Sequence, residues 1–203
     1  MSQRSLVWDV PTRVFHWSLA LSFAGAYLTS ETERYRDVHV GLGYVFLGLI
    51  LFRIIWGFTG SYYARFGNFS FKPSEVIAYG KSLLAKQPTH YVGHNPAGSV
   101  AIYLLLALGL MIGVSGILLY WEVGGEEAFE ELHEIAANGM LAVVLVHIAG
   151  VFASSFLHQE NLVRAMLTGY KQTETPTPAV RPYAVLGLML LAAVVGFLIF
   201  YLR

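Results

Sequence analysis

The sequence predicts an all-α integral membrane protein, a four-helix bundle followed by a fifth, C-terminal transmembrane helix. The 203-residue chain has a mean hydropathy of +0.56, and only 13% of its residues are charged. In a typical soluble domain about a quarter of the residues are charged. Apolar segments recur at the length of about 20 residues that a helix needs to cross a bilayer. We therefore expect one membrane bundle.

Five apolar segments form the predicted spans, at residues 14–30, 38–59, 98–121, 132–157 and 183–202. The first is short enough to be the core of a signal peptide. Phe15, His16 and Trp17 lie inside it, however, and no A-x-A cleavage site follows. We therefore treat it as a span.

Two connecting segments carry their own signals. Residues 73–86 predict a short helix, either interfacial or merely solvated, because apolar residues could share a face beside lysines while Gly80 interrupts the segment. Prolines and threonines predict a stiff, extended linker before the last span. The predicted parts are a bundle domain (1–171), a linker (172–182) and an additional transmembrane helix (183–203).

Lysines and arginines near the span ends predict the orientation, because these charges gather on the cytoplasmic side. Most lie on the side of the N-terminus: Arg4, Arg13, Arg53, Arg65, Lys72, Lys81, Lys86, Arg164, Lys171 and Arg181. The other side has Arg34, Arg36 and Arg203. We expect a multi-pass protein of a bacterial inner membrane, with a cytoplasmic N-terminus and a periplasmic C-terminus.

Four of the seven histidines lie in or at the mouths of the predicted spans: His16, His39, His133 and His147. His133 and His147 are 14 residues apart, which places them on nearly one face of a helix, about 21 Å apart along its axis. His16 opens its span on the cytoplasmic side, and His39 opens its span on the outer side. This predicts an inner pair, His16 with His147, and an outer pair, His39 with His133.

Two imidazoles that face each other are the axial ligands of a six-coordinate haem iron. Since the chain has no cysteine, no thiolate can hold a haem, a metal or an iron–sulfur cluster. Zinc or copper would need three or four ligands at one depth. A haem-free, proton-relay transporter would normally bring carboxylates to mid-membrane, and no Asp or Glu lies centrally in a span. We predict two bis-histidine haem b groups.

A cation is expected beside the inner pair. Arg53 follows His39 by 14 residues, so it has nearly the same helix face at the depth of the inner layer. There Arg53 could pair with a haem propionate, as could Arg13. Alternatively, Arg53 snorkels to the cytoplasmic headgroups. The remaining histidines are expected near the surface: His90, His94 and His158.

Several strings resemble the bacterial cytochrome b-561 and nickel–iron hydrogenase b-type cytochrome subunit superfamily. They are VWDVPTRVFHW (7–17), HVGLGYVF (39–46), FRIIW (52–56), YVGHNPAG (91–98), VHI (146–148) and MLTGYK (166–171). The resemblance covers about residues 6–171. It implies four helices with two b haems, ligated at the four histidines of the inner and outer pairs, that exchange electrons between quinone and a partner at the outer face. It also implies a quinone near the inner haem, for which Trp17, Lys81 and His94 are candidate contacts.

Glutamates crowd the predicted outer mouth: Glu122, Glu126, Glu127, Glu130, Glu131 and Glu134. A negative surface attracts a cationic redox protein and slows the approach of the superoxide anion. The connection at residues 121–131 is also shorter than in hydrogenase subunits. We therefore expect a periplasmic partner such as a basic c-type cytochrome. The chain is also expected to contact a lipid membrane, and no nucleic acid is expected as a partner.

Several alternatives to this partner remain. The chain could be an enzyme in its own right, a superoxide oxidase (superoxide:ubiquinone oxidoreductase). It could also be the membrane cytochrome b subunit of a nickel–iron hydrogenase, or a haem-free transporter. The acidic loop could equally reflect the positive-inside asymmetry and nothing more.

Overall fold

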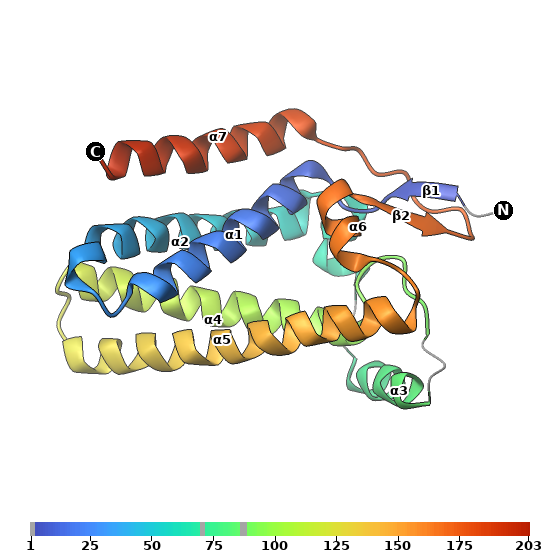
Figure 1. Ribbon diagram of the computed structural model, residues 1–203, viewed down its shortest axis with the longest axis horizontal. Coiled ribbons are helices and arrows are strands. Elements are labelled where there is room, and N and C mark those ends of the chain that lie inside the picture. The colour runs from blue at the N-terminus through green and yellow to red at the C-terminus, as the bar shows by residue number, and fades with distance from the viewer. Residues whose placement is uncertain (1–2, 70–71, 86–88) are drawn as a thin grey trace.

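The bundle is built from four long helices, with a fifth packed along its outside (Figure 1). The structure, a computed structural model, describes residues 3–69, 72–85 and 89–203. The long helices are α1 (Val10–Thr29), α2 (Arg36–Thr59), α4 (Pro96–Tyr120), α5 (Glu126–Leu157) and α7 (Ala184–Tyr201). The shorter elements are β1 (Gln3–Leu6), α3 (Pro73–Leu84), α6 (Leu162–Thr168) and β2 (Tyr170–Thr173), with 3-10 turns at Glu33–Tyr35, Tyr62–Ala64 and Phe66–Asn68.

The all-α membrane architecture is confirmed, with one difference in the spans. Among the described residues, four segments are long and apolar enough to cross a membrane: Glu33–Thr59, Pro96–Tyr120, Glu126–Leu157 and Ala184–Tyr201. The 20-residue helix α1 is not among them. Arg13 and His16 lie within α1 and lower its hydropathy. The role of α1 as a fifth span therefore stays a prediction.

The two ends of the bundle differ in what they carry. Figure 1 shows β1, β2, α3 and α6 at one end, with the N-terminus. At the opposite end lie the α1–α2 turn, the α4–α5 connection and the C-terminus (Figure 1). Successive connections between the long helices thus lie at alternate ends of the bundle, as the predicted membrane spans require.

Helix α1 begins at a buried carboxylate. Asp9 is the N-cap residue, and its Oδ1 accepts the backbone N–H of Thr12 at 2.7 Å. Its Oδ2 accepts the indole N–H of Trp56 at 3.1 Å. Asp9 is fully buried, so these two bonds satisfy a group that would otherwise be costly to bury. They join the start of α1 to the end of α2.

The core lies where α2, α4 and α5 meet and contains Phe46, Ile50, Leu106, Ile112, Ala136 and Met140. Glycines on α4 allow the close approach of α2. A Cβ built on Gly109 would lie 2.7 Å from Cδ1 of Ile50, and one on Gly113 would lie 2.5 Å from Cδ1 of Leu47. Small residues of this kind favour helix association in membranes, where the lipid is as apolar as the side chains.

A two-stranded sheet joins the N-terminus to the segment after α6. Strand β1 pairs antiparallel with β2, from Gln3 with Thr173 to Leu6 with Tyr170. The turn before β2 requires Gly169, whose φ is +87° and whose added Cβ would lie 2.5 Å from the carbonyl oxygen of Trp8. The predicted linker therefore begins within a strand. Two polar four-residue segments so far apart in sequence carry no strand signal.

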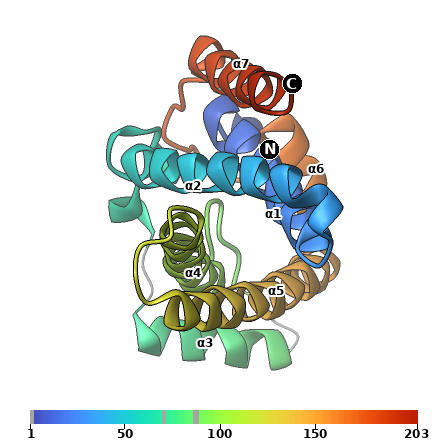
Figure 2. The same ribbon diagram turned by 90° about the vertical axis from the view of Figure 1, so that its left-hand side faces the viewer.

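Helix α3 lies across the bundle axis. Figure 1 shows it end-on and Figure 2 shows it lengthwise beneath α4 and α5. Its buried residue is Tyr79, whose hydroxyl is 3.3 Å from Oγ of Ser154, while Ile77 and Leu84 are exposed. Gly80 does not interrupt the helix. Of the two interpretations, this placement favours an interfacial helix.

Candidate functional site

The structure brings the predicted histidine partners together in both pairs. His16 of α1 and His147 of α5 face each other with ring centroids 6.5 Å apart. His39 of α2 and His133 of α5 do so with centroids 6.2 Å apart. Both α5 histidines lie in one continuous helix, so the two layers are about 21 Å apart along its axis.

The spacing within each pair fits one metal ion between two imidazoles. A metal–imidazole bond of about 2 Å on each side, plus roughly 1 Å from each nitrogen to its ring centre, gives about 6 Å between centroids. The interplanar angles of 54° and 64° are compatible, because each ring can rotate about its metal–nitrogen bond. Within the described part of the chain, no group of three or more His, Cys, Asp or Glu residues could hold a metal. The donor set of each pair therefore suits a haem iron, whose other four ligands come from the macrocycle.

The outer imidazoles are oriented by backbone carbonyls. Nδ1 of His39 is 2.8 Å from the carbonyl oxygen of Ala26, and Nδ1 of His133 is 3.0 Å from that of Ile112. Since a carbonyl oxygen only accepts, each Nδ1 carries the proton and each Nε2 keeps its lone pair for a metal. Such contacts fix the tautomer and raise the basicity of a ligating histidine. Oγ of Ser115 also lies 3.1 Å from Nδ1 of His133.

A cleft opens beside the outer pair, between α2 and α4. It is lined by both histidines and by Val40, Gly43, Tyr44, Phe46, Ile112, Gly113, Gly116, Ile117 and Tyr120. A Cβ on Gly43 would meet nothing within 4 Å, and one on Gly116 would be 3.0 Å from Cε1 of His133. A side chain at Gly116 would therefore crowd the ligand. The glycines leave room for a flat ligand beside the imidazoles.

Buried donors without partners lie at the end of the bundle that holds the inner pair. Arg53 is only 4% exposed, so it does not snorkel to the headgroups. Its guanidinium carbon lies 4.9 Å above the ring of Phe66. Among the described residues, Arg53 Nη1, Arg13 Nε and His16 Nδ1 are buried without a hydrogen-bond partner. Two unpaired guanidinium donors at this depth suit an anionic group such as a propionate.

The profile of the family described as prokaryotic cytochrome b561 matches residues 7–169. The chain belongs to this family. It is a membrane b-type cytochrome that transfers electrons, and it binds haem b. The matched residues end before β2, so the linker and α7 lie outside them.

Several curated relatives are similar to the cytochrome. A probable Ni/Fe-hydrogenase B-type cytochrome subunit from Azotobacter vinelandii is 24% identical, over 85% of this chain and 90% of the relative. Its counterpart from Rhizobium leguminosarum bv. viciae is also 24% identical, over 82% and 88%. The probable Ni/Fe-hydrogenase 1 B-type cytochrome subunit of Escherichia coli K12 is 22% identical, over 81% and 89%. No solved structure matches significantly.

The three candidate quinone contacts of the cytochrome lie in different surroundings. Trp17 packs edge-on against His16, with centroids 5.0 Å apart, and donates its indole N–H to the carbonyl oxygen of Met166 at 3.4 Å. Lys81 is exposed on α3. No described contact joins Lys81 to the other two.

His94 is only partly exposed and its Nδ1 is buried, so the expectation that it is a surface residue is wrong. Its ring packs between Trp8 and Phe69, with centroids 4.7 and 4.5 Å away. Burial, and to a smaller extent the charges of Arg53 and Lys171, lower the pKa of His94 to about 3. A neutral imidazole with an unpartnered, buried Nδ1 therefore lies within reach of the field of Arg53.

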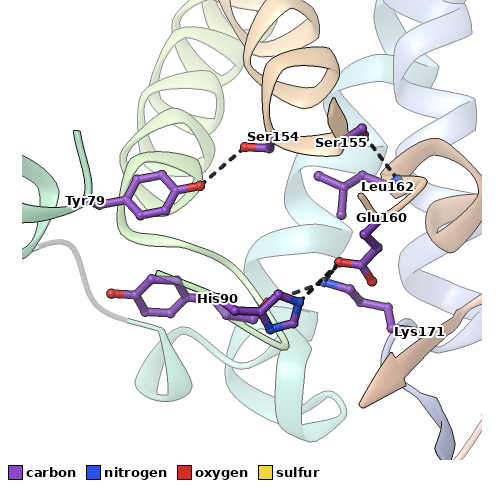
Figure 3. A network of polar contacts seen from close by, with 8 residues as sticks. Tyr79, His90, Ser154, Ser155, Glu160, Leu162 and Lys171 are labelled. Atoms are coloured by element: carbon purple, nitrogen blue, oxygen red, sulfur yellow. Dashed lines mark hydrogen bonds and ion pairs between the residues drawn. The ribbon is translucent and has the colours of Figure 1, made fainter. Parts of the chain in front are cut away.

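A polar network joins the connecting segments at the N-terminal end (Figure 3). Nζ of Lys171, whose side chain is 3% exposed, is 3.0 Å from Oε2 of Glu160. Nε2 of His90 is 3.7 Å from the same oxygen, and Lys171 also donates to the carbonyl oxygen of Tyr91 at 3.4 Å. In the sequence, Lys171 stands out only as a charge near a span end and as part of the string MLTGYK. Its partners are distant in the chain, and no local sequence pattern predicts these contacts.

Proposed function

We propose that the cytochrome holds two haem b groups, one in each histidine pair, and carries electrons across a bacterial inner membrane between the quinone pool and a periplasmic redox partner. One observation supports the proposal most directly. Two pairs of facing imidazoles lie at two depths along α5, and each pair has the spacing of a bis-histidine haem. When bound, haem supplies a one-electron iron couple whose potential the protein tunes.

The chain's own residues position each haem. His16 and His147 would hold the inner one, and His39 and His133 the outer one. The carbonyls of Ala26 and Ile112 orient the outer imidazoles. At the inner haem, Arg53 and Arg13 offer unpaired N–H donors to propionates.

The orientation follows from charge. The N-terminal end of the bundle carries most of the lysines and arginines, which supports a cytoplasmic N-terminus and a periplasmic C-terminus. The opposite end then faces the periplasm, where the outer pair lies nearest the surface.

The quinone is proposed to react near the inner haem. Trp17 packs against His16. His94 packs between the rings of Trp8 and Phe69, and the positive charge of Arg53 acts on it. Both offer polar groups beside apolar rings, which suits a quinone headgroup. Lys81 remains a candidate quinone contact only because it lies on α3, in the connection between α2 and α4.

The proposed partner is a cationic redox protein such as a basic c-type cytochrome. All six glutamates at residues 122–134 are exposed, and none has an ion-pair partner among the described residues. The connection between α4 and α5 is only residues 121–125. An unbalanced negative surface of this kind speeds association with a cation and slows the approach of superoxide, so it disfavours the superoxide oxidase reading.

A second candidate partner is a nickel–iron hydrogenase. It is favoured by the three relatives described above, each of which is named as a probable Ni/Fe-hydrogenase cytochrome subunit. The two partners are separable. With purified proteins, electrons should reach the haems from a basic cytochrome c in the first case, and from hydrogen only through an added hydrogenase in the second.

Transfer across the membrane is tested in sealed vesicles that contain the cytochrome, with ferricyanide trapped inside and dithionite added outside. We expect ferricyanide to be reduced in vesicles with the wild-type chain and only at the background rate with His147→Ala, which lacks an inner ligand. Equal rates for the two would overturn the proposal, because electrons would then cross without the inner haem.

A further inference from the structure

We propose that the last turn of α7 packs behind the tyrosines that line the outer haem site and that Tyr201, as a positioning residue, raises the reduction potential of that haem. The inference rests on the proposed function, because it requires a haem between His39 and His133. Helix α7 lies outside the residues that the family profile matches.

Tyr201 lies against α2 less than one turn from a haem ligand, on the opposite face of the helix. A Cβ built on Gly41 would be 2.8 Å from Cδ1 and 3.1 Å from Cε1 of the Tyr201 ring. Gly41 follows His39 by two residues. The absence of a side chain at Gly41 therefore lets the Tyr201 ring reach the backbone of the helix that carries His39.

Tyr201 also contacts the tyrosines that line the cleft of the outer pair. Tyr44 and Tyr120 both line this cleft. The ring of Tyr44 lies 6.0 Å from that of Tyr201 and 6.0 Å from that of Tyr120, in edge-on geometry, and Tyr201 interacts with the side chain of Tyr120. One residue of α7 thus packs on α2 and also reaches α4, on the side of the cleft.

The position of this last turn is fixed by the rest of α7. At its start, a Cβ on Gly187 would lie 2.4 Å from Cγ1 of Val10. Along its length, Val194 and Phe197 pack on the cluster formed by Phe15, Val45 and Leu49. Figure 2 shows α7 seated over α1 and α2, and Figure 1 shows its C-terminus at the end where α1 turns into α2. The packing of the whole helix therefore determines the contact of Tyr201.

Shielding of the cleft has a consequence for the iron. A ferric haem carries one more positive charge than a ferrous one, and a low-dielectric wall that excludes water disfavours the charged state. The potential of a haem therefore rises as its surroundings become drier. Removing the Tyr201 ring uncovers Tyr44 and Tyr120, which line the cleft. This should admit water at the membrane edge and lower the potential of the outer haem. The inner pair, about 21 Å away along α5, is too distant to share the effect.

The test is a redox titration of the purified full chain, followed by the absorbance of each haem, with His39→Ala used to assign the outer one. We expect Tyr201→Ala to lower the midpoint potential of the outer haem and leave that of the inner haem unchanged. Tyr201→Phe, which keeps the ring, should restore most of the wild-type value. Phe200→Ala is the matched control, because Phe200 is adjacent but 79% exposed, and it should titrate as the wild type does.

Unchanged midpoints in Tyr201→Ala, equal shifts of both haems, or the same shift in Phe200→Ala would overturn the inference. These results differ from a failure of the proposed function, which would appear as a wild-type chain without a haem at the outer pair.

Discussion

The indole N–H of Trp56 donates to Oδ2 of Asp9 at 3.1 Å, in the buried region where α1 begins and α2 ends. The other oxygen of Asp9 caps α1 through the N–H of Thr12. The carboxylate thus fixes the end of the bundle in which His16 and Arg53 lie. Removing it leaves an uncapped helix and an unpaired indole donor in the same place.

Asp9→Ala should therefore destabilise the protein by about 2–4 kcal/mol, of which about 1 comes from the lost cap and 1–3 from the unsatisfied N–H. Thermal unfolding in detergent, followed by far-ultraviolet circular dichroism, measures the change. Asp9→Asn keeps an oxygen that can cap the helix and should lose clearly less. Equal stability of the alanine variant and the wild type would contradict this role of Asp9.

His147→Ala should remove the inner haem and leave the outer one, because the two sites have separate histidine pairs about 21 Å apart along α5. The low-temperature absorbance of the purified variant should show one b haem with the bands that are lost in His39→Ala. If both substitutions removed the same haem, the pairing of His16 with His147 and of His39 with His133 would be wrong.

Arg53→Leu should lower the midpoint potential of the inner haem, because a buried cation favours the reduced, less positive iron. A unit charge at about 10 Å contributes roughly 1.7 kcal/mol at an effective dielectric constant of about 20. For a one-electron couple, about 1.4 kcal/mol corresponds to 59 mV, so the expected shift is tens of millivolts. Arg53→Lys is the control and should shift less. A shift confined to the outer haem would contradict the placement of Arg53.

Neutralising Glu126, Glu127, Glu130 and Glu131 together to glutamine should slow association with a basic cytochrome c by roughly tenfold at low ionic strength. The salt dependence should also flatten, because charges are screened beyond about 8 Å at physiological salt. Stopped-flow mixing across a salt series measures both effects, and haem content should not change. Superoxide should react faster with the variant. Unchanged rates with both reactants would leave the glutamates as topology determinants.

The sequence predicted the parts of the site that repeat along a single helix. The 14-residue spacing of His133 and His147 determines a common face and two depths, and a bilayer leaves few partners at each depth. The structure accordingly places His16 and His39 opposite them. For Arg53 the same spacing left two interpretations, and its burial favours the one in which it faces the bundle.

The parts that the sequence did not predict depend on contacts between distant segments. The pairing of β1 with β2 and the ion pair of Glu160 with Lys171 join residues with no periodic signal. The packing position of α7 could not be predicted from the sequence for another reason. A uniformly apolar helix shows no face preference, so nothing in its pattern indicated that Tyr201 packs on Gly41.

The most direct test is a reduced-minus-oxidised spectrum of the purified protein, combined with a haem-to-protein ratio from the pyridine haemochrome. Two facing imidazole pairs predict two low-spin b haems per chain. One haem per chain, or a high-spin spectrum, would contradict the arrangement of two bis-histidine haems along α5.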